Sequence, residues 1–313
     1  MPPNESPSGT GNNPYGMILP RYPVYIVSKG RWRRPYTARA LARDGVPFRL
    51  VVEAQEADAY ARVVGKERVL VLPFANLGLG SMPARNWIWE HALSEGHERH
   101  WVLDDNMRGF YRRWHGDRLP CEGGPALRAC EDFVDRYENV ALAGLNYSTF
   151  AHRNSGRKGG MPPFYLNVHV YSCILILSRI PYRWRGRYNE DTDLCLQVLS
   201  GGWCTVLLNA FLVQKMVTMA MRGGNTDVLY AGDGRLRMAR SLERAWPGVV
   251  QVIRRFRRPQ HWVDWTRFRN RLKPKQSRGA TEASGLDWAV QLEQLAPSVR
   301  HPRLRRYVSE AMK

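Results

Sequence analysis

Long apolar runs are missing from this chain of 313 residues, and the longest of them, VYSCILIL at 170–177, has the length of a buried strand. A membrane-spanning helix needs about 20 apolar residues, so we expect no membrane anchor. The first residues, MPPNESPSGTGNNPYG, have neither the basic start nor the apolar stretch of a secretory signal. We expect a disordered leader over residues 1–20 and a cytoplasmic protein.

Cysteine and acidic residues are scarce as well. The five cysteines lack the paired spacing of a zinc site, and their odd number within apolar patterns favours reduced thiols in the core. Asp and Glu number 28 against 47 Lys and Arg, which gives a formal net charge of +19. A basic excess of this size favours a polyanionic partner, most often nucleic acid, although a generally basic protein would share it.

Hydrophobic residues make up 44% of the chain, enough for a folded core, and they follow alternating strand and helix patterns. The predicted strands of the first third are 24–28, 48–53, 68–73 and 100–105, separated by helices at 36–44, at 55–64 and after Ser81. This order predicts an α/β fold with a Rossmann-like, mostly parallel central sheet that carries helices on both faces.

The rest of the chain divides into two parts. Strands are predicted at 140–148, 167–178 and 203–208, with a helix over 187–202 that Asn189 would cap. We expect one domain over 21–235, made of a half at about 21–110 and a half at about 111–235. The segment 236–313 is rich in Lys and Arg, and we expect a basic helical extension there.

Parallel sheets bind ligands beyond the carboxyl ends of their strands. That rule brings four segments to one edge of the sheet: Ser28 to Arg31, Glu53, the loop NLGLGS at 76–81 and Asp104 to Asn106. The loop is neither a P-loop nor a dinucleotide fingerprint, because it lacks Gly-Lys-Ser/Thr and the GxGxxG spacing.

Asp104, Asp105 and Asn106 are the sharpest acidic feature of this basic chain. Oxygen ligands at a strand end suit a hard divalent cation such as Mg²⁺ or Mn²⁺. Asp and Asn also suit a turn, which is the alternative. Adjacent carboxylates repel each other and gain little as a cap after a buried strand, so we favour a metal site.

Two helix starts carry further candidates. Glu190 and Asp191 are expected at the start of a helix, where a carboxylate can act as general base or can simply complement the helix dipole. A third acid in four positions, Asp193, exceeds what capping requires. Arg85 and Asn86 follow Ser81 in the first turn of their helix, a place suited to a phosphate, although Arg85 could also be a solvated surface residue.

The stretch 252–278 interleaves basic and aromatic residues. Arginines there could bind a DNA or RNA backbone while tryptophans stack on bases, or the aromatics could pack on the body with the arginines facing water. The candidate DNA-binding residues are Arg254, Arg255, Arg257, Arg258, Trp262 and Trp265. His169 lies in an apolar alternation typical of a packed histidine, and it is also a candidate acceptor-site residue.

Together the segments VYIVSKGR, LVVEA, GLGSMPARNW, WVLDDN and NEDTDL resemble the GT-A glycosyltransferase fold over roughly residues 20–230. More narrowly, the same motifs with YLNVHVYSCILI and NEDTDLCLQVL resemble the phage TET-associated glycosyltransferases, which glycosylate 5-hydroxymethylated pyrimidines in phage DNA. The resemblance implies a donor half at 21–110, an acceptor half at 111–235 and a place in an infected or phage-carrying bacterial cell.

The resemblance also implies roles for single residues. Asp191, helped by Glu190, would be the base at the acceptor hydroxyl, and Asp104 would approach the ribose or donor sugar. Asp105 and Asn106, with Asp104, would hold the Mn²⁺ or Mg²⁺ that bridges the donor diphosphate. The residues implied at the UDP-sugar are Ser28, Lys29, Gly30, Arg31, Glu53, Arg85 and Asn86. The residues expected at the acceptor or sugar are Asn167, His169 and Tyr171.

This sequence departs from the pattern of the fold in two places. Asn106 stands where an acid is expected, which should weaken metal binding. Relatives of the fold supply a late histidine ligand, but no histidine lies between His169 and His261, and Gln214 and Lys215 occupy that place. Lys215 is therefore a candidate to neutralise the diphosphate directly.

The expected reaction is metal-assisted transfer of a sugar from a UDP-sugar to the hydroxyl of 5-hydroxymethylcytosine, or of a related hydroxymethylated base, in DNA. A base inside a duplex must be flipped out or met in open DNA. One alternative is a glycosyltransferase acting on a cell-surface or protein acceptor. Another is a non-catalytic nucleic-acid-binding protein on the same fold, since fold does not fix function.

Overall fold

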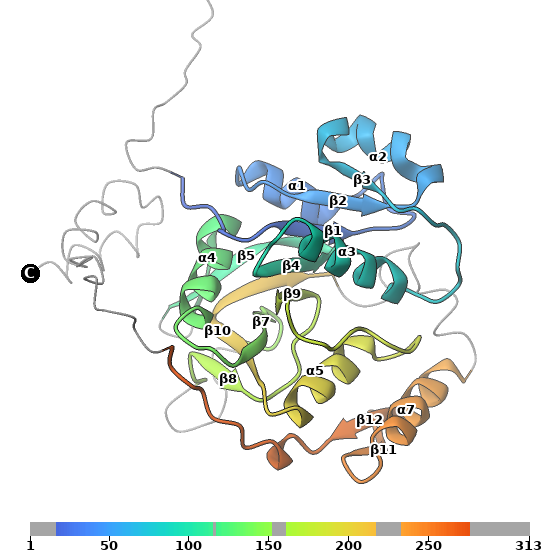
Figure 1. Cartoon of the computed structure of the whole chain (residues 1–313), viewed down its shortest axis with the longest axis vertical. Helices are drawn as coiled ribbons and strands as arrows, with labels where there is room; N and C mark the ends of the chain where they lie inside the picture. The colour runs from blue at the N-terminus through green and yellow to red at the C-terminus, as the bar shows by residue number, and fades with distance from the viewer. Residues whose placement is uncertain (1–16, 115–116, 152–160, 217–232, 276–313) are drawn as a thin grey trace, which may run out of the picture. The chain divides into compact units, whose positions relative to one another are not determined.

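The computed structural model describes residues 17–114, 117–151, 161–216 and 233–275 (Figure 1). Residues 1–16 of the leader expected over 1–20, and the last part of the basic extension, from 276 onward, lie outside these ranges. The chain divides into two units, Met1–Pro274 and Lys275–Lys313, and every helix and strand with described bounds lies in the first. None of the helices in the described ranges is long and apolar enough to cross a membrane.

A central sheet of ten strands organises the first unit (Figure 1). Its strands run in the order β3-β2-β1-β4-β9-β7-β10-β5-β6, and β8 pairs separately with β10. Their bounds are β1 Val24–Val27, β2 Arg49–Val52, β3 Val69–Val71, β4 Arg99–Asp104, β5 Met107–Trp114, β6 Asp117–Cys121, β7 Val140–Tyr147, β8 Phe164–Leu166, β9 Cys173–Leu177 and β10 Cys204–Lys215.

The sheet is mixed, and not mostly parallel as the sequence predicts. Strands β3, β2, β1 and β4 are parallel to one another, and β7 is parallel to β10. Strand β9 is antiparallel to both β4 and β7, and β5 is antiparallel to β6 and β10. Only residues 115–116 separate β5 from β6, which is too short for a parallel crossover.

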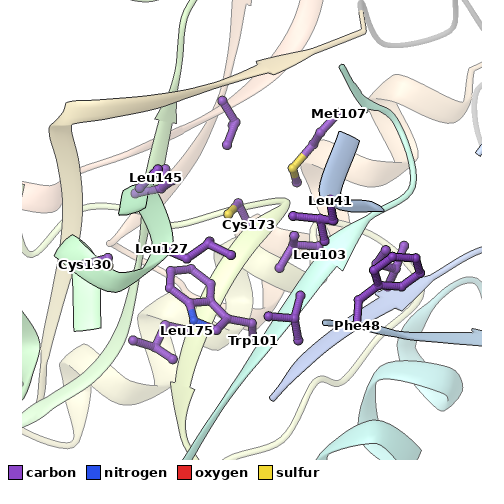
Figure 2. Close-up of a cluster of buried hydrophobic side chains, with 14 of the residues drawn as sticks. Leu41, Phe48, Trp101, Leu103, Met107, Leu127, Cys130, Leu145, Cys173 and Leu175 are labelled. Carbon is purple, nitrogen blue, oxygen red and sulfur yellow. The ribbon is translucent and has the colours of Figure 1, made fainter. Parts of the chain in front are cut away.

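Helices cover both faces of the sheet, as expected. Helices α1 (Tyr36–Arg43), α2 (Ala57–Val64) and α4 (Gly123–Val134) pack on one face, and α3 (Met82–Ser94) and α5 (Glu190–Ser200) pack on the other. The alternation along the strands explains this division: Trp101 and Leu103 of β4 enter the first core, while Val102 between them enters the second. Figure 2 shows part of the first core, where Trp101, Leu103, Cys173 and Leu175 come together.

Two local expectations are wrong, and three elements were not expected. The strand expected over 167–178 begins only at Cys173, because Asn167 and Ser172 have positive φ angles of 56° and 63° that interrupt an extended backbone. Asn189 does not cap α5 with its side chain, since its own φ is 52° and its amide donates to the carbonyl of Met238 at 2.8 Å. Strands β5 and β6 and helix α4 were not expected.

The segment after 235 differs most from its expected helical form. Helix α7 (Gly234–Ala245) is followed by a two-stranded hairpin of β11 (Val250–Arg255) and β12 (Arg258–Val263), and then by a short 3-10 helix at Trp265–Arg267. The run Val-Gln-Val-Ile at 250–253 favours a strand because β-branched residues pack well on a pleated surface. A small core joins Val250 and Val263 of the hairpin to Leu242 of α7 and Leu196 of α5. This packing explains why the first unit continues past 235.

Candidate active site

Four chain segments bring charged side chains together at one end of the sheet. Asp104 is the last residue of β4 and Lys215 the last of β10. Arg85 lies in the first turn of α3, and Asp191 lies in the first turn of α5. Strand pairing sets the neighbours of Asp104, because Val27 of β1 is its register partner and its amide donates to the carbonyl of Ser172 at 2.8 Å.

Arg85 connects the strand carboxylate to the helix carboxylates. Its Nη2 donates to Asp104 at 2.8 Å, its Nη1 donates to Asp191, and Glu190 lies 3.9 Å from the same nitrogen. Burial opposes the charge of Arg85, but these carboxylates outweigh it and raise the pKa of the guanidinium. The Nε of Arg85 is buried without a hydrogen-bond partner among the described residues. One donor of this arginine therefore lacks an acceptor within the part of the chain that the structure describes.

Lys215 occupies the other side of Asp104. Its ammonium donates to Asp104 at 3.0 Å, to the Ser172 hydroxyl at 2.6 Å and to the Tyr147 hydroxyl at 3.2 Å. Burial would raise the pKa of Asp104, but Lys215 and Arg85 lower it well below its usual range. Asp104 is therefore an anion held between two cationic side chains at neutral pH.

Asp105 points away from Asp104 and belongs to a second group of residues. It accepts hydrogen bonds from the Ser28 hydroxyl at 2.6 Å and from Arg31 Nη1 at 2.6 Å. Tyr60 of α2 completes the group, because its hydroxyl is 2.6 Å from Ser28 Oγ and accepts the backbone N–H of Arg31 at 3.0 Å. Burial raises the pKa of Asp105 despite Arg31 and Ser28. The strand that ends at Val27 thus places Ser28 and Arg31 around a buried carboxylate.

Lys29 and Glu53 form a third group next to this one. Lys29 donates to Glu53 at 2.8 Å and to the side chain of Asn76 at 2.9 Å. The backbone N–H of Asn76 also donates to Glu53 at 3.1 Å. Burial acts to raise the pKa of Glu53. The hydrogen bonds that Glu53 accepts from Lys29, Gln55 and Asn76 outweigh burial, so the pKa is lowered overall. Gly30 has a φ of 70° and donates its N–H to Glu56 at 2.8 Å.

Asp191 is held in one orientation by two donors on the same oxygen. The Trp184 indole N–H donates to Oδ1 at 3.0 Å, and Arg85 donates to that oxygen as well. None of the described residues donates to Oδ2. Burial raises the pKa of Asp191, with Arg85 acting in the opposite direction. A carboxylate with one fixed oxygen, one open oxygen and a raised pKa has the properties of a general base.

Asn86, which was expected at the nucleotide, hydrogen-bonds with the backbone of Trp184. Its side-chain amide donates to the carbonyl of Trp184 at 2.8 Å, and its side-chain oxygen accepts the Trp184 N–H at 3.1 Å. The fully buried Trp184 ring also packs edge-to-face on Trp89 at 5.3 Å. Asn86 therefore fixes the backbone of the residue that orients Asp191.

These residues lie within the region that comparison with known families identifies. A family model, TET-associated glycosyltransferase, matches residues 22–224. The chain belongs to this family. It is therefore a glycosyltransferase, and the resemblance inferred from its motifs is confirmed. No curated protein matches the chain.

The expected acceptor residues of the glycosyltransferase form an aromatic row that leads to Lys215. The ring of His169 stacks on Tyr171 with centroids 4.4 Å apart, and Tyr171 meets Tyr147 edge-on at 4.3 Å. Tyr147 then contacts the Lys215 ammonium. Burial lowers the pKa of His169 to about 4, so the ring is neutral at pH 7. His169 is thus a packed histidine that is linked to Lys215 through the rings of Tyr171 and Tyr147.

Asn167 has a structural position in this enzyme. Its side-chain amide nitrogen donates to the carbonyl oxygen of Asn270 at 2.8 Å and to the carbonyl oxygen of Phe268 at 3.3 Å. Its side-chain oxygen is buried without a partner among the described residues. Asn167 therefore anchors the segment that follows the hairpin.

The candidate DNA-binding residues separate into two sets. Arg254, Arg255, Arg257 and Arg258 are exposed on the β11–β12 hairpin, and Trp262 is 44% exposed. Trp265 instead packs inward, with its ring 5.7 Å from His169 and 6.4 Å from Phe268. Of the two tryptophans, only Trp262 presents a large surface to solvent.

The fold family implies a divalent cation, and the residues present do not form a ligand set for it. The four carboxylate oxygens of Asp104 and Asp105 already accept hydrogen bonds from Arg85, Lys215, Arg31 and Ser28. Asn106 Oδ1 is buried without a partner among the described residues, so it is one open oxygen ligand. No group of three or more His, Cys, Asp or Glu side chains in the described ranges could hold a metal. A magnesium site usually includes one or two carboxylates besides water and substrate oxygens, and both carboxylates here are engaged with other side chains.

Sequence analysis missed four residues of the site. They are Tyr60, Tyr147, Ser172 and Trp184. Tyr60, Tyr147 and Ser172 each act through a contact with a residue distant in the sequence, whereas Trp184 contacts Asp191 seven positions away. Ser81, expected as a helix cap, donates to Glu190 at 2.7 Å and makes no side-chain cap. The only local signal is the position of Ser172, which directly precedes a buried strand.

Proposed function

We propose that this glycosyltransferase has a GT-A-like fold and transfers a sugar from a UDP-sugar to the hydroxyl of 5-hydroxymethylcytosine, or of a related hydroxymethylated base, in DNA. The observation that carries the proposal is Asp191, which has one oxygen fixed by Arg85 and Trp184 and the other open. The reaction forms a bond from the acceptor oxygen to the anomeric carbon and breaks the bond from that carbon to the diphosphate. The acceptor proton goes to Asp191 Oδ2.

The donor end of the site supports a nucleoside diphosphate. The Ser28–Arg31 segment follows a parallel strand, and Lys29 and Glu53 lie beside it where a base and ribose would bind. Negative charge develops on the leaving diphosphate, and Lys215 and the open Nε of Arg85 are the cationic groups nearest to the centre of the site. Groups already placed where charge develops stabilise the transition state without reorganisation.

No step of this mechanism passes through a metal ion. The expected Mn²⁺ or Mg²⁺ remains a prediction, because Asp104 and Asp105 are engaged with cationic side chains and a serine. Lys215 stands beside Asp104 at the place where a cation ligand was expected from the fold. We assign to it the neutralisation of the diphosphate.

DNA as acceptor follows from charge and from the residues near the base. A formal net charge of +19 favours a polyanion. The Tyr147, Tyr171 and His169 rings offer aromatic faces near Lys215 on which a flipped base could stack. A cell-surface or protein acceptor is the alternative, and it gives no reason for the basic excess.

One experiment tests the proposal. The protein is incubated with hydroxymethylcytosine-containing DNA and a mixture of UDP-sugars, and the nucleosides are then released and weighed by mass spectrometry. We expect a hexose added to the hydroxymethylated base with the wild type and none with Asp191→Asn. UDP release without a modified nucleoside would indicate another acceptor. The absence of both products would indicate a nucleic-acid-binding protein without catalysis.

A further inference from the structure

The turn of the β11–β12 hairpin has an unusual composition. Arg255 pairs directly with Arg258, so Phe256 and Arg257 alone form the loop, and their φ angles are 51° and 59°. Two-residue hairpin loops with positive φ at both positions are of type I′, for which Asn-Gly is strongly preferred. Left-handed backbone is unfavourable for a bulky residue such as Phe. Local stability alone would therefore not select Phe-Arg at this turn.

The side chains around the turn add two further unfavourable features. Phe256 is 76% exposed, the largest value among the exposed large hydrophobic residues of the described chain. Arg255 and Arg258 are directly opposite each other, and like charges in that position destabilise a strand pair. No acidic side chain of the described residues pairs with Arg254, Arg255, Arg257 or Arg258. The turn thus carries four arginines without an acidic partner among the described residues, around one exposed aromatic ring. The Arg255 guanidinium lies over that ring, 5.1 Å from its centroid.

Two explanations that do not involve a partner account for only part of this arrangement. Charged residues and proline protect the edges of a small sheet from pairing with other chains, and Pro259 and the arginines fit that role. Edge protection does not explain an exposed phenylalanine at the tip. The ring is also not part of the protein core, because the hairpin is attached through Val250 and Val263 at its other end.

We propose that the hairpin tip is a docking element for duplex nucleic acid, with Phe256 inserted at the bases and the arginines around it on phosphates. The chemistry of the tip indicates the partner: guanidinium groups bind phosphate in two-pronged geometry, and two-stranded ribbons enter the grooves of duplex DNA. Apolar side chains of this kind wedge between base steps in architectural DNA-binding proteins. The small core at the base of the hairpin supplies a firm support for the tip.

This inference rests on the proposed DNA acceptor, but its test needs neither donor sugar nor modified base. Binding to a fluorescent duplex of unmodified sequence is measured by anisotropy over a range of salt concentrations. In one variant Phe256→Asn and Arg257→Gly install the preferred turn residues. We expect this protein to melt at a higher temperature than the wild type and yet to bind the duplex at least tenfold more weakly.

Further variants separate the contribution of the Phe256 ring from that of the arginine charges. Phe256→Ala should weaken duplex binding about tenfold with the salt slope unchanged, and Phe256→Trp should restore it, since stacking needs a ring and no charge. Arg254→Gln with Arg257→Gln should reduce the slope of log affinity against log salt by about 1.8, for two lost phosphate contacts. The matched control is Arg39→Gln with Arg62→Gln, exposed on α1 and α2. It should leave the slope nearly unchanged.

Three outcomes overturn the inference. Wild-type duplex affinity in the Asn-Gly variant would do so, as would equal slope changes in the hairpin and control pairs. Phe256-dependent binding to vesicles of anionic lipid, without Phe256-dependent binding to the duplex, would assign the tip to a membrane surface instead. If the hairpin effects appear and no sugar is ever transferred to DNA, the proposed acceptor fails and the docking element stands.

Discussion

Trp184 donates its indole N–H to the carboxylate oxygen of Asp191 that Arg85 also holds, with the nitrogen and oxygen 3.0 Å apart. Asn86 fixes Trp184 from the other side through both of its backbone groups. Asn86 belongs to α3, Trp184 to the loop before α5 and Asp191 to the start of α5. The arrangement leaves the second oxygen of Asp191 without a donor among the described residues.

Trp184→Phe tests whether this contact orients the base. The phenyl ring of the variant still occupies the core, but the indole N–H is lost. Because that hydrogen bond favours the carboxylate, its loss should raise the pKa of Asp191 further and move the acidic limb of the pH–rate profile upward. We expect kcat to fall about tenfold with KM for the UDP-sugar unchanged. Trp87→Phe, in the same helix as Arg85, is the control. Equal losses in both variants would indicate a packing effect only.

Asp191→Asn and Glu190→Gln separate the two carboxylates at the start of α5. Asp191→Asn should lower kcat by roughly 10²- to 10⁴-fold while UDP binding, measured by calorimetry, persists. Glu190→Gln should lower kcat less than tenfold. Glu190 accepts a hydrogen bond from Ser81 and lies 3.9 Å from Arg85, so it supports the site and is not the base. A greater loss in Glu190→Gln than in Asp191→Asn would exchange the two assignments.

Activity should increase with pH through the raised pKa of Asp191. A base must be deprotonated to accept a proton, and burial favours the neutral form of this carboxyl group. The acidic limb of kcat should therefore lie above the usual range of an aspartate. A limb at or below pH 4 in the wild type would argue against Asp191 as the base.

Lys215→Met tests which cation neutralises the diphosphate. Removing the ammonium from its contacts with Asp104, Ser172 and Tyr147 should lower kcat about 10²- to 10³-fold. Wild-type activity should survive treatment with EDTA and removal of free metal. Activity that disappears with the chelator and returns with Mn²⁺ would instead support the cation site predicted from Asp104, Asp105 and Asn106. Arg62→Met, exposed on α2, controls for loss of a positive charge.

His100 should make the stability of the protein depend on pH. The ring is fully buried, its Nδ1 lies 2.9 Å from the Ser178 hydroxyl, and burial lowers its pKa to about 3. Below pH 6.5 the unfolded chain takes up a proton at this residue that the folded chain does not bind, so folding stability falls as the pH falls toward 3. Urea unfolding at pH 6.5 and 5 should show a loss about 1.5 kcal/mol larger in the wild type than in His100→Gln. Equal losses would contradict this.

The sequence by itself determined the ends of the strands and the residue types that gather there. Val24–Val27, Arg49–Val52 and Arg99–Asp104 form strands as predicted, and each is followed or closed by polar residues of the site. Parallel strands must bring these ends to one edge of a sheet, so Ser28, Glu53 and Asp104 could be predicted as neighbours. The family motifs extend the same local information.

Only the tertiary structure decided which side chains meet. Lys215 and Asp104 are 111 positions apart and join because β10 and β4 end at the same side of a mixed sheet, whose antiparallel β9 was not predicted. Trp184 reaches Asp191 from the loop before α5, and Asn86 hydrogen-bonds with Trp184, 98 positions away. The hydrophobic pattern of a segment indicates its secondary structure and which of its faces is buried. The residues that pair with a charged side chain are determined by long-range packing. The hairpin at 250–263 follows the same rule, since its valines pack on Leu196 and Leu242 and leave the arginines exposed at its turn.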